Sequence, residues 1–317
     1  MTEPIHILSL GAGVQSSTLA DLASCGKVLP MPRCGIFADT QAEPPSVYEW
    51  LDYLTPRLAF PVIRVTRGSL EQEALVMRRS KKGLVYSRTD IPFFTLAQDG
   101  SRGKIKNRSC TADYKIKPLM AKAREIVGRE AMRDWRKRHA DALKTWGDWK
   151  KAAAAAKRAK LQPPPFPLVA WNECQDDALV VQWVGISTDE VTRMKPSRDP
   201  WARTRWPLIE LNMSREKCKT WMKERGHPEP PRSACVFCPY HDPREWRRLQ
   251  IREPVQFERA VQFERAVQSA KARSQNIAST PFLHRSCVPL DKIDFRSESE
   301  RGQGDLFENE CEGMCGV

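Results

Sequence analysis

Residues 5–17 read IHILSLGAGVQSS, and this stretch decides the fold. Ile5–Leu10 is an apolar run typical of a buried strand, and the small residues Gly11-Ala12-Gly13 follow it directly. A helix is predicted from Ser16 to about Ser24. Small residues let backbone amides approach an oxyanion, and the start of a helix adds positive potential. The stretch therefore predicts a strand, a phosphate-binding turn and a helix, with an ordinary strand–helix turn as the alternative.

The same alternation of strands and helices continues outward from this stretch. Further strands are predicted at Cys34–Ala38, Pro61–Val65 and Leu179–Ile186, and helices at Ser46–Leu58 and Leu70–Arg79. Such alternation indicates an α/β fold in which helices cover both faces of a twisted parallel sheet. We therefore predict three parts, which are a nucleotide-binding α/β domain at 1–127 and 168–230, a basic helical insertion at 128–167, and a Cys-rich helical region at 231–317.

The composition favours an anionic partner. The 317 residues include 52 Lys and Arg against 39 Asp and Glu, a formal net charge of +13. A balance this basic suits a nucleotide, a nucleic acid or a membrane headgroup. We expect a cytoplasmic protein without a membrane span, because no long apolar run and no secretory pattern occurs. In that compartment the ten cysteines indicate metal ligands, reactive thiols or core residues rather than disulfides.

More than half of the net charge lies in residues 128–162, which hold 11 Lys and Arg and 4 Asp and Glu. The abundance of Ala and long basic residues predicts a protruding helix or helical hairpin, punctuated by Gly147 and by the prolines at 163–165. Trp135, Trp146 and Trp149 are interleaved with the basic residues. We therefore expect nucleic acid to bind here, with bases stacked on the rings. A solvated helix face is the alternative.

A polar motif, Asp39-Thr40, follows the second predicted strand. Ligands bind at the carboxyl edge of a parallel sheet, so we expect these two side chains to meet a nucleoside. Glu43, four residues on, can simply start the next helix.

Together these motifs resemble the PP-loop ATP pyrophosphatase superfamily, and within it the phosphoadenosine phosphosulfate reductase-like branch. The superfamily loop S-G-G-x-D-S corresponds to residues 11–16, with Gly11 and Gln15 in place of the first Ser and the Asp. The branch's D-T-G corresponds to Asp39-Thr40-Gln41, and its G-x-R-x-x-E-S-x-R resembles the segment from Gly185 to Arg193. The resemblance implies a Rossmann-like sheet that binds ATP or an adenylyl sulfate, with Mg²⁺ as a further candidate, through Ser9, Gly11, Ala12, Gly13, Gln15, Ser16, Ser17, Asp39, Thr40, Gly185 and Arg193.

The cysteines give a second constellation. Cys110 lies in the segment 107–119, which resembles the C-C-x-x-R-K-x-x-P-L signature of iron–sulfur adenylylsulfate reductases, and Cys235-Val236-Phe237-Cys238-Pro239 supplies a later C-x-x-C. Two thiolates on one turn favour an iron–sulfur cluster or zinc. Arg108 and Arg232 nearby would stabilise thiolates. The resemblance implies a 4Fe–4S cluster held by Cys110, Cys235 and Cys238.

The fourth ligand has several candidates. We favour Cys315 as ligand and Cys311 as a mobile nucleophile, because the end of the chain resembles the E-C-G-[IL]-H tail of sulfonucleotide reductases. Cys287 and Cys311 are the alternatives as ligand. Packing roles are expected for the remaining cysteines, which are Cys25, Cys34, Cys174 and Cys218.

Three functions fit these observations. The first is ATP-dependent adenylation of a nucleic acid followed by sulfur insertion, with a sulfur donor or reductant protein as a further partner. The second is sulfonucleotide reduction, with Cys311 as the attacking thiol. The third is a nucleic-acid-binding module with a structural metal. VQFERA, which occurs twice at 255–266, is expected to be a duplication within one exposed helix and carries no function here.

Overall fold

The computed structural model describes residues 3–87, 90–104, 108–273 and 279–296. The chain divides into two compact units. The first unit comprises Met1–Phe37, Asp52–Val65 and Leu119–Pro230, and the second comprises Ala38–Leu51, Thr66–Pro118 and Pro231–Val317. Each unit is described by itself.

A five-stranded sheet forms the centre of the first unit, in the order β3-β2-β1-β8-β9. Strand β1 pairs in parallel with β2 and β8, and β8 pairs in parallel with β9. All five residues of β8 are buried, as expected for a strand covered on both faces. The predicted α/β sheet is thereby confirmed. Its strands are β1 (Ile5–Ser9), β2 (Cys34–Asp39), β3 (Val62–Thr66), β8 (Val180–Val184) and β9 (Ala202–Arg205).

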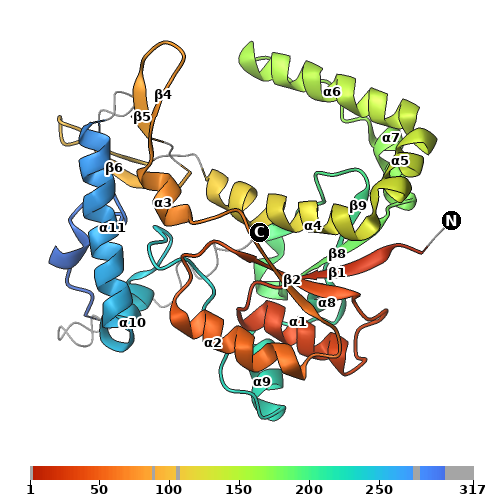
Figure 1. Cartoon of the computed structure of the whole chain (residues 1–317), viewed down its shortest axis with the longest axis horizontal. Helices are drawn as coiled ribbons and strands as arrows, with labels where there is room; N and C mark the ends of the chain where they lie inside the picture. The colour runs from red at the N-terminus through yellow and green to blue at the C-terminus, as the bar shows by residue number, and fades with distance from the viewer. Residues whose placement is uncertain (1–2, 88–89, 105–107, 274–278, 297–317) are drawn as a thin grey trace. The chain divides into compact units, whose positions relative to one another are not determined.

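Helices cover this sheet on both faces. In Figure 1, α1 and α9 lie on one face and α4 on the other. Helix α9 begins at a Ser214 cap, whose side chain accepts a hydrogen bond from the amide of Lys217. The helical elements of this unit are α1 (Val14–Ser24), η1 (Thr55–Arg57), the main part of α4 (Lys117–Val127), α5 (Arg129–Arg138), α6 (Ala140–Arg158), α7 (Leu168–Asp176), η3 (Thr188–Arg193), α8 (Pro207–Glu210) and α9 (Arg215–Glu224).

The second unit has its own apolar core and two small antiparallel sheets. Strand β4 pairs with β5, and β6 pairs with β7 and β10. The rings of Phe237 and Phe263 stack at 4.0 Å in the core. The elements are most of α2 (Pro45–Leu54), α3 (Leu70–Leu75), β4 (Met77–Arg79), β5 (Val85–Ser87), β6 (Phe94–Leu96), β7 (Arg102–Lys104), the π-helical turn η2 (Thr111–Ile116), α10 (Pro243–Arg252), α11 (Pro254–Ala272), β10 (Thr280–Phe282) and η4 (Leu290–Lys292).

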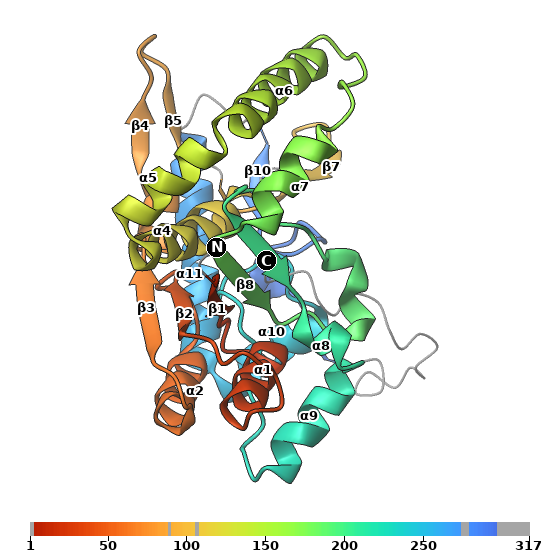
Figure 2. The same ribbon diagram turned by 90° about the vertical axis from the view of Figure 1, so that its right-hand side faces the viewer.

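The basic insertion is helical, but one of its three tryptophans, Trp135, does not have the expected role. Helices α6 and α7 lie side by side (Figure 2). Trp135 is 1 % exposed, and its indole N–H donates to the carbonyl of Asp177 at 2.7 Å. The expectation that this ring stacks on a base is therefore wrong. Trp146 and Trp149 are half-buried. Trp146 packs on Trp171 of α7, beyond the predicted insertion, and Trp149 packs on Phe166. Helix α6 also runs through Gly147 without a break.

Two other predicted helices differ from the structure. The helix expected at Leu70–Arg79 ends at Leu75, because residues 77–79 pair with β5 instead. The helix expected at Ser46–Leu58 ends its α-helical part at Leu54. Such pairing between separate segments leaves no trace in local helical periodicity.

The VQFERA duplication is a core helix rather than an exposed one. Six residues turn an α-helix by about 600°, so equivalent residues of the two copies face different directions. Glu258 of the first copy is exposed. Glu264 of the second copy is 2 % exposed and accepts backbone hydrogen bonds from Leu283 and Leu290, both at 2.8 Å. Burial raises the pKa of Glu264.

Within the described part of the chain, no helix combines the length and the apolar character that a membrane span needs.

The two equivalent glutamates of the duplication, exposed Glu258 and buried Glu264, allow a matched stability test. Glu264→Ala leaves two buried amides without an acceptor, which should cost about 2 kcal/mol or more. Glu258→Ala changes an exposed position and should stay within about 0.5 kcal/mol of the parent. The midpoint of urea unfolding measures both. Equal effects of the two substitutions would contradict the buried role of Glu264.

Candidate functional site

The glycine turn of the first unit forms a compact loop between β1 and α1. Ser16 stabilises the loop, since its Oγ accepts from the amide of Gly11 at 3.1 Å and donates to the carbonyl of Gly13 at 3.3 Å. Gly13 is the N-cap residue and has no side chain to cap α1. The first amides of such a helix therefore remain available to an anion.

Ala12 is the strained residue of this loop. It is buried and has a φ of +59°, in the left-handed region where a Cβ is unfavourable. The neighbouring Gly11 has ordinary room around it, since an added Cβ would meet only Ser16 Oγ at 3.6 Å. The strain therefore lies at one residue, in the turn that the sequence motif predicts as the phosphate site.

Gly185, at the end of β8, packs directly on this loop. A Cβ at Gly185 would lie 2.9 Å from both N and Cα of Ser16, which is closer than side chains approach backbone. Gly185 thus allows the close approach of β8 to the loop. This contact joins two segments that the sequence analysis assigned to one nucleotide site.

Polar side chains connect the glycine loop to the turn at Ser187, which follows β8. Gln15 Nε2 donates to Ser187 Oγ at 3.4 Å, and Arg215 Nη1 donates to Gln15 Oε1 at 3.2 Å. The buried Nε of Arg215 has no hydrogen-bond partner among the described residues. Arg193, predicted to bind nucleotide, makes a 2.6 Å ion pair with Glu190. The Gln at position 15 thus has a structural role that the family motif does not suggest.

Asp39 and Thr40 belong to the second unit. The carboxylate of Asp39 is buried and accepts hydrogen bonds from the Gln41 amide at 2.7 Å and from the Tyr48 hydroxyl at 2.9 Å. Thr40 Oγ1 lies 3.4 Å from Cys235 Sγ. Thr40 therefore contacts a cysteine of the predicted cluster motif.

Three predicted metal ligands, Cys110, Cys235 and Cys238, line one cavity in the second unit. Cys110 comes directly before η2, and the other two come from the loop before α10. Other polar residues of the lining include Thr40, Arg108, Lys115 and Tyr240. Segments more than 120 positions apart in the chain thus bring three thiols and two cations to the same place.

The C-x-x-C turn has a defined internal geometry. The amide of Cys238 donates to the carbonyl of Cys235 at 3.0 Å. His241 Nε2 lies 2.9 Å from the same carbonyl, and burial lowers the pKa of His241 to about 3. A neutral imidazole with its proton on Nε2 can donate to that carbonyl. His241 was not predicted as part of this site, although its position three residues after Cys238 was the available signal.

One ion pair lies beside the cavity, and its carboxylate is buried. Lys115 Nζ lies 3.0 Å from Glu43 Oε1, and Glu43 is only 2 % exposed. Glu43 therefore does more than start a helix. Burial raises the pKa of Cys235 to about 12, with Glu43 acting in the same direction and Lys115 opposing both. The thiol of Cys235 is consequently protonated at neutral pH unless a metal displaces the proton.

The residues that line this cavity have suitable donor atoms for a thiolate-bound metal group. The cavity itself, however, is small. In the parts of the chain that the structure describes, no three His, Cys, Asp or Glu side chains are placed to hold a single ion. A cubane cluster takes one thiolate per iron, so its ligands surround a larger object. The cavity volume is about 40 Å³. A cluster would therefore move lining side chains apart.

The remaining cysteines divide between packing and exposure. Cys34, Cys174 and Cys218 are buried, as expected, and burial raises the pKa of each thiol. Cys25 is exposed, so its predicted packing role is wrong. Cys287 is 7 % exposed and its Sγ donates to the carbonyl of Thr95 at 3.6 Å. The two tail residues, Cys311 and Cys315, lie outside the described residues.

The chain matches no family model, no curated protein and no solved structure.

Gly185→Ala tests the contact between β8 and the loop. The added methyl group must displace the backbone at Ser16, which should cost about 1–3 kcal/mol and lower the melting temperature. Gly147→Ala is the matched control, since its Cβ would meet no atom within 4 Å. Because Ala is the better helix former, this control should raise stability by about 0.5–1 kcal/mol. A melting temperature unchanged by Gly185→Ala would contradict the close packing.

Proposed function

We propose that this protein is an ATP-dependent sulfurtransferase-like enzyme of the PP-loop ATP pyrophosphatase superfamily, acting in the cytoplasm on nucleic acid. The observation that carries the proposal is the convergence of Cys110 with Cys235 and Cys238 on one cavity, beside Arg108 and Lys115. Soft sulfur donors on a half-buried, partly cationic wall suit an anionic iron–sulfur cluster.

The glycine loop supplies the proposed nucleotide site. The amides at the start of α1 would bind the phosphates of ATP, with Ser16 and Ser17 in the first turn. Arg215 lies beside the loop through Gln15, so its positive charge would favour the same anion. A nucleoside contact by Asp39 and Thr40 stays a prediction from the sequence.

The proposed reaction has two steps. An oxygen of the nucleic acid attacks the α-phosphorus of ATP, and the bond to pyrophosphate breaks. A sulfur nucleophile then attacks the activated atom, and AMP leaves with the oxygen. Positioning and electrostatic stabilisation by backbone amides and cations are the contributions this chain would make to the first step.

The metal group is proposed to be a 4Fe–4S cluster on Cys110, Cys235 and Cys238, with Cys315 as fourth ligand. When bound, it would supply the sulfur or the electrons that sulfur transfer needs. Thr40, Arg108 and Lys115 would surround the ligands, and His241 would fix the C-x-x-C turn through the carbonyl of Cys235. Cys311 is the proposed nucleophile.

Iron and sulfide analysis tests the metal group. Protein purified without oxygen should contain about four iron and four sulfide per chain. Cys235→Ser and Cys238→Ser should each lose most of both, because a hydroxyl is a poor ligand for this cluster. Cys25→Ser removes an exposed thiol and should keep the full content. Stoichiometric zinc without sulfide would contradict the cluster.

The loop is tested by pyrophosphate release in the presence of nucleic acid. Ala12→Gly should keep the activity, because Gly adopts a φ of +59° without strain. Ala12→Val should lower it at least tenfold, since a β-branched residue strongly disfavours that conformation. Mass spectrometry of digested nucleic acid should detect a thionucleoside. Conversion of an adenylyl sulfate to sulfite, with no pyrophosphate released, would contradict this proposal. The function would then be sulfonucleotide reduction.

A further inference from the structure

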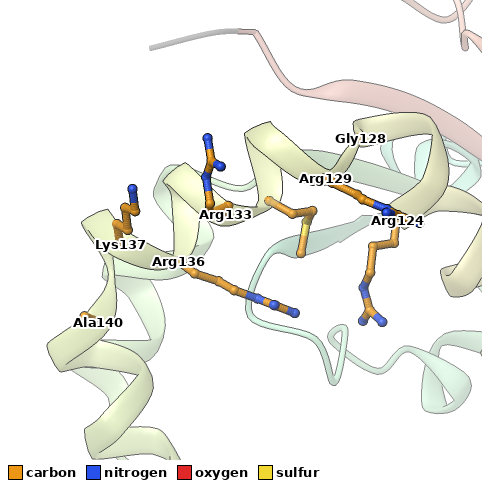
Figure 3. Close-up of a pocket in the computed structure, with 8 residues that line it drawn as sticks. Arg124, Gly128, Arg129, Arg133, Arg136, Lys137 and Ala140 are labelled. Carbon is orange, nitrogen blue, oxygen red and sulfur yellow. The ribbon is translucent and has the colours of Figure 1, made fainter.

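A strongly basic groove lies along α4 and α5 of the first unit, apart from the glycine loop. Figure 3 shows the cationic side chains that line it, with Arg133 and Lys137 above the helix and Arg124 and Arg136 below it in this view. The groove has a volume of about 520 Å³. It is lined by Arg124, Gly128, Arg129, Met132, Arg133, Arg136, Lys137 and Ala140.

The stripe of cations follows from the sequence of α5. Arg129, Arg133 and Arg136 are spaced i, i+4 and i+7, so their side chains leave the backbone from one side of α5 over about 10 Å of helix. The ends of the Arg133 and Arg136 side chains then extend in different directions (Figure 3). Met132 and Trp135 lie on the buried face. Gly128, with a φ of +89°, makes the turn that brings the end of α4 beside the stripe. The helix is therefore amphipathic with arginine on its outer face.

Little within the described residues neutralises these charges. No carboxylate lines the groove. Arg124 lies 3.8 Å from Asp199, and Arg133 lies 3.5 Å from its neighbour Asp134. Arg129, Arg136 and Lys137 are exposed and form no ion pair with the described part of the chain. Cations one turn apart repel each other, so a bound polyanion would relieve that repulsion.

We propose that this groove binds the phosphodiester backbone of a nucleic acid without reading its sequence. Four of its five cations are arginines, whose planar fork matches a phosphate in two hydrogen bonds. The described residues that line the groove include no aromatic ring, Asn or Gln, so they offer no group for base stacking or amide pairing with base edges. The nucleic acid as substrate rests on the proposed function, whereas the groove itself rests on its own geometry.

The same observations disfavour a membrane surface. An interfacial helix presents large apolar side chains beside its basic residues. On α5 the large apolar residues are Met132 and Trp135, at 4 % and 1 % exposed. The basic residues therefore have no apolar partners that could enter a lipid layer.

The position of the stripe also limits the proposed nucleic-acid contacts of the basic insertion to its first helix, α5. Arg138 points to the other side of α5 and makes two hydrogen bonds to Asp177 Oδ2, at 2.8 and 3.2 Å. Residues of α6 do not line the groove beyond its first residue, Ala140. Basic residues on α6 therefore provide a charge-matched control.

Salt-dependent binding tests the groove. Arg129→Ala, Arg133→Ala and Arg136→Ala are combined in one variant, and fluorescence anisotropy follows 20-nucleotide single strands and duplexes of two unrelated sequences. Three lost phosphate contacts should reduce the slope of log K against log salt by about 2–3 and weaken binding at least tenfold. The two sequences should behave alike. The control, Lys144→Ala with Lys157→Ala and Arg158→Ala, should keep the slope.

Several results would decide against the proposal that this groove binds nucleic acid. One is an unchanged slope in the triple variant, and another is an equal reduction in the control. Vesicles of phosphatidylserine that bind the parent through the three arginines, with no binding of nucleic acid, would assign the groove to lipid. Loss of binding by the variant without any thionucleoside in the parent would support the groove and contradict the proposed function. Thionucleoside formation by a variant with an unchanged slope would contradict the groove alone.

Discussion

The candidate metal site depends on how the segment around Cys235 is fastened to the chain after β2. The amide of Val236 donates to the carbonyl of Ala42 at 2.8 Å, and Thr40 Oγ1 lies 3.4 Å from Cys235 Sγ. These contacts join positions almost 200 residues apart. Val236 and Ala42 are themselves fully buried in the apolar core of the second unit. The C-x-x-C turn is therefore supported by a packed core, which is what a site needs to keep its ligands in one geometry.

Cys110 lines the same cavity from a different segment of the chain, and different contacts hold it in place. Its amide donates to the carbonyl of Asp90 at 3.1 Å, and its side chain packs against the same core. The π-helical turn η2 follows it directly, a local structure that is frequent at functional sites. Burial keeps the thiol of Cys235 protonated at neutral pH, so a metal would have to displace protons as it binds. This dependence links metal binding to the packing around the thiols.

Local patterns predicted four of the five strands of the sheet, because these four are largely apolar runs. The strand, turn and helix at residues 5–24 show this. Local patterns missed β9, whose sequence ARTR at 202–205 has a single buried residue. Prediction failed where distant segments decide the structure, as at 77–79, which leave a predicted helix to pair with 85–87. Trp135 was misjudged although Met132, Trp135 and His139 follow the spacing of a buried helix face. The cavity could not be predicted from the spacing of the cysteines, because Cys110 and Cys235 are far apart in the sequence and come together only in the folded chain. Their association was expected only from a family resemblance.

The central claim is that Cys110 and the C-x-x-C turn face one cavity, and it can be measured without any metal or substrate. Metal-free native protein is treated with a short bifunctional thiol reagent, and cross-linked peptides are identified by mass spectrometry. The account predicts links between Cys110 and Cys235 or Cys238, which disappear when the protein is unfolded before treatment. Links confined to Cys235 and Cys238, with Cys110 modified singly, would contradict it.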